Sequence, residues 1–230
     1  MAISVLLVAS TPEPDRTVAA AARLCYSDAS AGDLVGKMKG EDISRFIDHL
    51  RGSGHLSPFE HAVFTFAVDG ISRVCTHQLV RHRLASYSQQ SQRYVEMKDP
   101  EAVVPPSISS NPAAREIFDR KIRESHEAYK DMIAAGIPRE DARYILPHGW
   151  MTKIVVTMNA RELHHFFSMR LCRRAQWEIR CLAREMLAIV RDKAPCLFSL
   201  AGPDCVVRGR CFENRPCGSP FSNVDEVLSE

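Results

Sequence analysis

Residues 153–170 read KIVVTMNARELHHFFSMR and place a strand directly before a helix. The β-branched run from Lys153 to Met158 is typical of a buried strand. Asn159, with Glu162 three residues later, forms the N-cap and capping-box pattern that starts a helix. We therefore predict a strand and then a long helical region, which breaks around residues 168–173 because the apolar stripe shifts there.

The same patterns extend in both directions from this stretch. Apolar alternation and β-branched runs predict strands at residues 3–8 and 63–68. Thr11 and Pro12 are expected to cap and begin the first helix, and Asn111 to cap a long amphipathic helix. Apolar stripes predict the further helices at residues 42–51, 71–80 and 112–135.

The composition is that of an ordinary packed globular protein, with 230 residues of which 45% are hydrophobic and 25% are charged. We expect one α+β domain over residues 1–195 and a cysteine-containing C-terminal tail over residues 196–230. The formal net charge of +2 argues against a polycation that coats nucleic acid. No signal-peptide pattern and no run near the roughly 20 apolar residues of a membrane span is seen, so we expect a cytoplasmic protein without membrane contact.

Eight cysteines are interpreted as reduced thiols rather than as a disulfide framework. The last four are separated by nine, six and six residues, whereas zinc sites usually contain cysteine pairs two to four residues apart. A metal in the tail is therefore less favoured than free thiols, although the pattern leaves both open. These four are Cys196, Cys205, Cys211 and Cys217.

Residues 78–94, QLVRHRLASYSQQSQRY, form the most distinctive stretch of the chain. From Gly70 through Val95 there are four arginines and no Asp or Glu, so this segment attracts anions. A solvated basic helix end is the plainer interpretation. The hydroxyls and amides that follow the arginines favour a site that holds a phosphate and a heterocycle.

Arg81, His82, Arg83 and, after seven further residues, Ser91 complete the signature Arg-His-Arg-x7-Ser. The sequence here resembles the flavin-dependent thymidylate synthases. Further matches lie in the same order along the chain: HLSPFEH at 55–61, Arg143 before Leu146-Pro147, NARELHHFFSMR at 159–170 and AQWEIR at 175–180. The resemblance thus covers most of residues 55–180.

The resemblance implies a fold, a reaction and partners. The fold would be a single α+β domain with a mixed or antiparallel sheet packed by long helices. The reaction would be reductive methylation of dUMP to dTMP, with methylenetetrahydrofolate as carbon donor and NADPH-reduced FAD as hydride source. The enzyme would be a homotetramer with active sites shared between subunits.

Carried over residue by residue, the resemblance assigns two overlapping sets of contacts. It implies FAD contacts at His55, Ser57, Arg81, His82, Arg83, Gln89, Asn159, Arg161 and His165. It implies dUMP contacts at Gln78, Leu79, Val80, Arg81, Gln89, Gln90, Ser91, Gln92, Arg93, Arg143 and Arg170. Two positions depart from some relatives, since Gln89 stands where a glutamate can stand and His165 where an asparagine can stand.

Arg170 is the predicted catalytic residue. A fixed cation favours the anion of a nearby weak acid, so this guanidinium could hold the uracil ring in a deprotonated, more nucleophilic form. The plainer interpretation is a surface arginine beside Arg173 and Arg174. Ser91 is interpreted as a substrate-binding hydroxyl, because no acidic residue in the motif could orient His82 as a general base.

No metal site is predicted. His55, His61, His77 and His82 are not spaced like metal ligands, and neighbouring residues His164 and His165 point to different helix faces. The chain also contains neither G-x-G-x-x-G after a strand nor a P-loop, so FAD would bind without the common dinucleotide fold.

Two other functions compete with this interpretation. Pro195-Cys196 and Pro216-Cys217 superficially resemble the nucleophile of a cysteine-dependent methylase, although their surroundings do not match. An RNA- or DNA-binding module could use the arginines with Tyr87 and Tyr94 as stacking platforms. Two tyrosines and a net charge of +2 make that case thin, so we expect no nucleic-acid partner.

Overall fold

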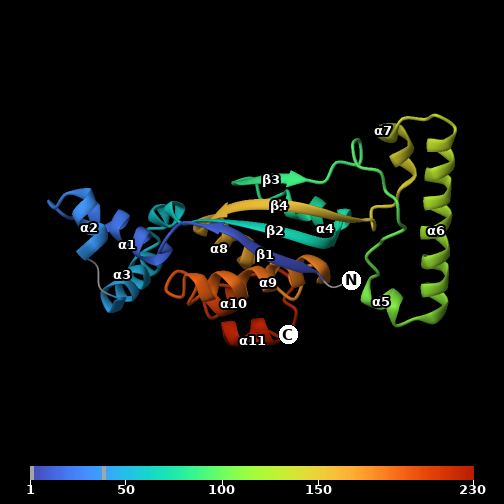
Figure 1. Cartoon of the computed structure of the whole chain (residues 1–230). Helices are drawn as coiled ribbons and strands as arrows, with labels where there is room; N and C mark the ends of the chain where they lie inside the picture. Colours follow the sequence, from blue (N-terminus) through green and yellow to red (C-terminus); the bar gives the residue numbers. More distant parts are fainter. Residues whose placement is uncertain (1–2, 38–39) are drawn as a thin grey trace. The chain divides into compact units, whose positions relative to one another are not determined.

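The computed structural model describes residues 3–37 and 40–230 (Figure 1). The strands are β1 (Ser4–Ser10), β2 (Val63–Ser72), β3 (Ala85–Gln89) and β4 (Met151–Asn159). The helices of the first half are α1 (Pro14–Leu24), α2 (Ala31–Lys37), α3 (Gly40–Gly52) and α4 (Arg73–Leu79). Those of the second half are α5 (Pro106–Ser109), α6 (Pro112–Ala134), α7 (Arg139–Ala142), α8 (Ala160–Arg170), α9 (Trp177–Lys193), α10 (Asp204–Val207) and α11 (Val224–Ser229). Single 3-10 turns lie at Ser57–His61 and Arg143–Ile145.

The four strands form one sheet in the order β1-β2-β4-β3. Ala160 N–H donates to the Ala62 carbonyl at 2.8 Å, and the Thr65 and Thr157 hydroxyls meet at 3.0 Å. Residue numbers on β2 thus rise while those opposite them on β4 fall, which is the register of an antiparallel pair. Helices joined to this antiparallel sheet give the α+β fold that the sequence predicts.

The chain divides into two compact units. The first comprises the residues up to Ser4 together with Val68–Arg81 and Ser88–Val155. The second comprises Val5–Ala67, His82–Tyr87 and Val156–Glu230. The segment after residue 195 belongs to the second unit, and the boundary drawn there from the sequence stays a prediction.

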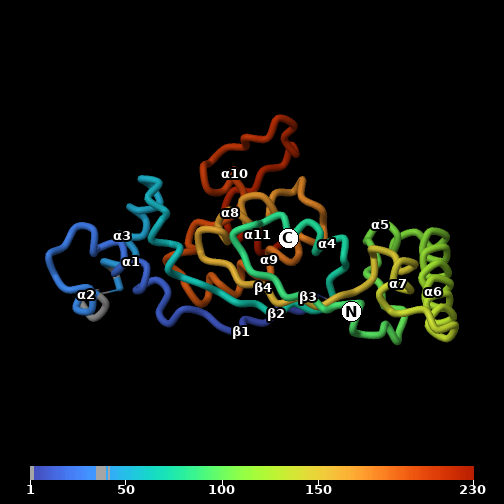
Figure 2. Tube along the Cα trace, turned by 90° about the horizontal axis from the view of Figure 1, so that it is seen from above, coloured from blue at the N-terminus to red at the C-terminus, as the bar shows by residue number. Residues whose placement is uncertain are grey.

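The core of the first unit lies beneath α6. Ile122 and Tyr129 from α6 pack with Met97, Leu146 and Trp150. Helices α5 and α7 lie beside α6 in both views (Figures 1 and 2). Asn111 accepts a hydrogen bond from Ala114 N at 3.1 Å, which confirms it as the N-cap of this helix.

Aromatic side chains fill the core of the second unit. Phe198 lies edge-on to Phe64 of β2, with ring centroids 5.6 Å apart, and contacts Phe167 of α8 at 6.0 Å. All three rings are fully buried. Helix α8 follows β4 directly, as the opening stretch of sequence predicts, and ends at the expected break before α9. The residue that caps α8, Asn159, accepts from Glu162 N at 2.9 Å.

Two predicted helix starts are wrong. The first helix begins at Pro14 rather than Pro12, because Thr11 is used by the sheet: its hydroxyl accepts from Val63 N at 2.9 Å. The stripe at residues 71–80 is helical only from Arg73, since Ile71 still belongs to β2 and Ser72 accepts from Cys75 N as the N-cap. In both cases a strand contact overrides local helix propensity.

Within the described residues, no helix combines the length and the apolar character that crossing a membrane requires.

Candidate active site

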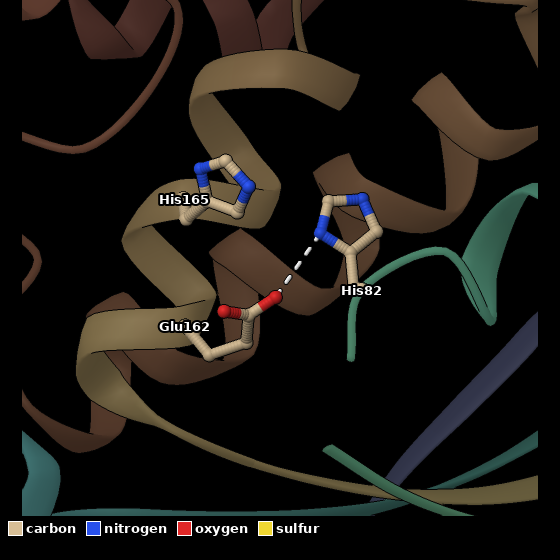
Figure 3. Close-up of side chains that lie close together, drawn as sticks. All are labelled: His82, Glu162 and His165. Carbon is tan, nitrogen blue, oxygen red and sulfur yellow. Dashed lines mark hydrogen bonds and ion pairs between the residues drawn. The ribbon is translucent and has the colours of Figure 1, made fainter. Parts of the chain in front are cut away.

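Side chains from two distant segments meet inside the second unit. His82 Nδ1 lies 3.2 Å from Glu162 Oε1 (Figure 3). Arg170 Nε lies 3.0 Å from His82 Nε2. The His82 and Glu162 side chains are 2% and 5% exposed, so water screens their contact little. Glu162, His82 and Arg170 therefore form a continuous chain of hydrogen bonds.

The protonation state of His82 follows from its two neighbours. The Nε–H of Arg170 can only donate, so His82 Nε2 must accept through a lone pair. His82 Nδ1 then carries the proton of a neutral imidazole and donates to the Glu162 carboxylate. Burial, followed by the electrostatic effects of Arg170 and His165, lowers the pKa of His82 to about 4, in agreement with a neutral ring. Burial also raises the pKa of Glu162, and His165 opposes that shift.

Helix α8 brings these groups together through its periodicity. Glu162, Phe166 and Arg170 are four residues apart and so lie on one helix face. The His82 ring packs edge-on against Phe166 with centroids 5.0 Å apart, between its two hydrogen-bonding partners. Tyr87 holds the backbone of the motif from the other side, because its hydroxyl donates to the His82 carbonyl at 2.7 Å. The motif histidine is thus fixed at both ring and backbone.

His165 joins the same cluster (Figure 3). The ligand atoms of His82, Glu162 and His165 all lie within 4.8 Å of one another, a spacing at which two imidazoles and a carboxylate could hold a divalent metal. The sequence did not predict this cluster, because His82 lies 80 or more positions before the other two members and meets them only in the fold. However, the Arg170 guanidinium donates to the same imidazole and would repel a metal cation there. That the protein binds no metal stays a prediction.

Three predicted flavin contacts line one cavity of the second unit. His55, Ser57 and Arg161 border a volume of about 420 Å³, a size typical of ligand pockets. Arg161 pairs with Glu60 at 2.5 Å, but both side chains are about half exposed, so an anionic ligand could take over the guanidinium. Tyr26, on the same cavity, is 68% exposed and offers an aromatic face.

In the first unit, Gln89 is tied to the protein interior. Its Nε2 donates to Thr76 Oγ1 at 3.3 Å and to Thr152 Oγ1 at 3.2 Å. The next residue, Gln90, donates its N–H to the Lys153 carbonyl and accepts from Arg73 Nη2. The predicted ligand-binding segment therefore begins on hydrogen-bonded residues at the end of β3.

Arg73 and Arg143 place two guanidinium groups near each other in the first unit. Burial and the charge of Arg143 lower the pKa of Arg73. The buried Nε of Arg73 has no hydrogen-bond partner in the part of the chain that the structure describes. A pair of like charges with an unsatisfied donor favours an anion between them.

Arg93 corrects one sequence-based expectation. The motif contains no acidic residue, yet Arg93 Nε donates to Glu140 at 2.7 Å, from 47 positions further along the chain. Arg93 also lies over the Tyr94 ring. Ser91 accepts from Arg93 N and forms a local turn, while Gln92 is buried.

The remaining predicted contacts lie at the end of α4 and just beyond it. Arg81 is exposed, and its Nε donates to the His77 carbonyl of its own helix turn, at 3.2 Å. Arg83 is exposed, whereas Leu79 is fully buried and so lines no open surface. Gln78 is partly buried and Val80 is exposed.

Comparison with known proteins agrees with these motifs. Residues 6–196 match the family model described as thymidylate synthase complementing protein. The chain is 48% identical to the flavin-dependent thymidylate synthase of Geobacter sulfurreducens, with 99% of each chain covered, and 45% identical to that of Clostridium tetani, with 95% of this chain and 94% of the other covered. The chain belongs to the flavin-dependent thymidylate synthase family. It is a flavin-dependent enzyme of dTMP biosynthesis that transfers a methyl group.

A solved structure of a third relative supports the same assignment. A UMP/dUMP methylase from Streptomyces cacaoi, bound with 5-Br dUMP, superposes with a TM-score of 0.78 at 28% identity, covering 86% of this chain and 93% of the methylase. The cysteine-nucleophile alternative is not supported. Burial, followed by the neighbouring Asp15, raises the pKa of the Cys196 thiol to about 11, which leaves it protonated and poorly nucleophilic.

Three residues of these sites escaped the sequence interpretation. Glu162 was seen only as a capping-box residue, although its contact with His82 spans 80 positions. Arg73 was counted among the motif arginines without a site role. Tyr26 carried no motif. No local spacing reveals such contacts, because the fold creates them.

Proposed function

We propose that the enzyme methylates C5 of the uracil ring of dUMP, with methylenetetrahydrofolate as carbon donor and NADPH as reductant of a bound FAD. The methylene carbon must gain a hydride to become a methyl group, and C5 must lose its proton. Because the hydride comes from reduced flavin, the folate leaves as tetrahydrofolate without being oxidised. The observation that carries the proposal is the hydrogen bond that fixes the Arg170 guanidinium on the His82 ring. It occurs in a chain that contains the family's motifs.

The residues present fit FAD. The cavity of His55, Ser57 and Arg161 combines a cation, polar groups and the face of Tyr26, which suits a phosphate and a ring. Exposed guanidiniums at Arg81 and Arg83 suit further phosphate oxygens. The other residues we assign to FAD are His82, Gln89, Asn159 and His165. When bound, FAD would supply the hydride.

We assign dUMP to the arginine-rich segment. Its contacts are Gln78, Val80, Arg81, Gln89, Gln90, Ser91, Gln92, Arg93, Arg143 and Arg170, whereas the fully buried Leu79 is left out of the proposed set. Arg143 would hold the phosphate, which fits the anion-seeking pair that it forms with Arg73. Arg93 would exchange Glu140 for the phosphate, because their half-exposed ion pair is weak. Arg170 would stabilise negative charge on the uracil ring and so raise the nucleophilicity of C5.

A cytoplasmic homotetramer with shared active sites completes the proposal. All eight cysteines are free thiols in the structure, which fits a reducing compartment. Large apolar side chains at Leu84, Tyr94 and Tyr144 are 71%, 73% and 85% exposed, and contact with other subunits would cover them.

Arg170→Ala tests the catalytic assignment. The variant should retain bound flavin, seen in its visible spectrum, but turn over dUMP at least about 100-fold more slowly, since one charge-stabilising donor contributes this much in other enzymes. The assay is dTMP formation from dUMP, methylenetetrahydrofolate and NADPH, with wild type as control and tetrahydrofolate as the expected folate product. Normal turnover in the variant, or wild-type activity without flavin, would contradict the proposal.

A further inference from the structure

We propose that Glu162 is a positioning residue for the reaction: it acts through the His82 ring to fix the Arg170 guanidinium against the nucleotide. This inference rests on the proposed role of Arg170 in dUMP binding. It adds a residue whose sequence context, the first turn of α8, indicates only a helix cap.

The first step is the choice of tautomer. A neutral imidazole free of constraints can carry its proton on either nitrogen. The Glu162 carboxylate, 3.2 Å from Nδ1, accepts only a proton-bearing nitrogen and so selects the Nδ1–H form of His82. With Nδ1 protonated, Nε2 has a lone pair directed at Arg170.

The second step is the orientation of Arg170. Its Nε–H donates to His82 Nε2 at 3.0 Å, which fixes the plane of the guanidinium. If the proton of His82 moved to Nε2, two donors would face each other and this hydrogen bond would be lost. With the Nε2–H tautomer, Arg170 would therefore lose the contact that orients it, although no residue that touches the substrate had been changed.

The third step is the cost of burying Glu162. Its side chain is 5% exposed, and removal of a carboxylate from water is unfavourable unless strong partners compensate. As a cap, this residue uses its backbone N–H, which donates to Asn159, and the side chain is not needed there. Its side-chain carboxylate instead faces His82 and His165 (Figure 3). The function of this carboxylate, whose burial is energetically unfavourable, is to orient the His82 imidazole.

A double-mutant cycle measures whether Glu162 acts through Arg170. The dissociation constant of dUMP is determined for the flavin-loaded wild type, Glu162→Gln, Arg170→Ala and the double variant. We expect Glu162→Gln to weaken binding about 5- to 20-fold when Arg170 is present and less than about twofold when it is absent. Equal factors in both backgrounds would overturn the inference. Failure of wild type to bind dUMP would instead overturn the proposed function.

A second measurement reads the tautomer directly and needs no ligand. The ¹⁵N shifts of the two His82 ring nitrogens distinguish Nδ1–H from Nε2–H, and His82→Asn assigns the signals. Wild type should show the Nδ1–H form, and Glu162→Met, which removes both acceptor oxygens, a shift toward Nε2–H. An unchanged tautomer in a folded Glu162→Met protein would overturn the inference.

Two further variants separate positioning from stability. His164→Gln changes a buried histidine of the same helix that bonds the Leu197 carbonyl and stacks on Phe198, away from His82. It should lower stability while leaving the His82 tautomer and dUMP affinity unchanged. Glu162→Met replaces the buried carboxylate with an apolar side chain of similar size, which buried sites often tolerate. It should weaken dUMP binding as Glu162→Gln does, and wild-type affinity in a folded Glu162→Met protein would refute the role of the carboxylate.

Discussion

His82 and His164 are two histidines that the fold keeps neutral by enclosing them. Burial, aided by Arg51, lowers the pKa of His164 to about 4, against the opposing effect of its bond to the Leu197 carbonyl. The pKa of His82 is lowered to about 4 by burial, Arg170 and His165. Both rings titrate near pH 6.5 once the chain unfolds. Between these values the unfolded chain binds protons that the folded chain does not.

Stability should therefore fall as pH drops from about 6.5 to about 4, by at most about 3 kcal/mol for each histidine. Above pH 6.5 both states are neutral at these positions and the effect vanishes. His164→Gln keeps a donor for Leu197 but cannot titrate, so its unfolding free energy should depend less steeply on pH than that of wild type. Denaturant unfolding at pH 8, 6.5, 5.5 and 4.5 measures this. Identical slopes for the two proteins would contradict the assignment.

At the scale of elements, the start of a helix is fixed by the residue that caps its N-terminus. Asn111 and Asn159 each accept a backbone N–H with the side-chain oxygen, at the start of α6 and of α8. Asn159 also has a proposed flavin role, so its substitution would mix two effects. Asn111 is an exposed residue of the first unit and has no proposed ligand role, so its substitution tests the cap alone.

Asn111→Ala should lower the free energy of unfolding by about 1 kcal/mol, because one N–H of the first turn of α6 loses its acceptor. Asn111→Ser supplies another hydroxyl acceptor and should recover most of that loss. Thermal or denaturant unfolding measures the effect, and dTMP formation should stay at the wild-type rate in both variants. If Asn111→Ser were as unstable as Asn111→Ala, a contact of Asn111 other than the helix cap would account for the lost stability.

The sequence predicted α8 and α6 well because their signals are local: an N-cap, an apolar stripe and a terminating break. It mistook Thr11 for a helix cap because its real partner, Val63, lies 52 positions away. The candidate site divides in the same way. The motif residues were found from spacing, whereas the contacts His82–Glu162 and Arg93–Glu140 required the fold. The charge balance of a site cannot be judged from neighbours in sequence alone.

At the scale of the whole molecule, the proposed assembly depends on surface that a monomer would leave exposed. Leu84 directly follows the Arg-His-Arg motif and is 71% exposed. The proposed shared active sites would bring another subunit against the motif, so we expect Leu84 to lie at a subunit contact.

Leu84→Glu should therefore shift the protein toward smaller species, because a carboxylate would be buried at the contact without a partner. Light scattering measures the mass, and the flavin spectrum shows whether dissociation releases the cofactor. Far-ultraviolet circular dichroism should stay unchanged, as should all three measurements for Lys130→Glu on the exposed face of α6. A tetramer that persists in Leu84→Glu would argue against an interface at this position.

A cysteine also lines the cavity bordered by His55, Ser57 and Arg161. Cys25, next to Tyr26, lines it and is exposed. A small aromatic compound that stacks on the tyrosine and carries a mild electrophile could form a thioether there. If FAD binds in this cavity, as proposed, such a compound would compete with the cofactor, which makes this corner of the protein a starting point for covalent inhibitors.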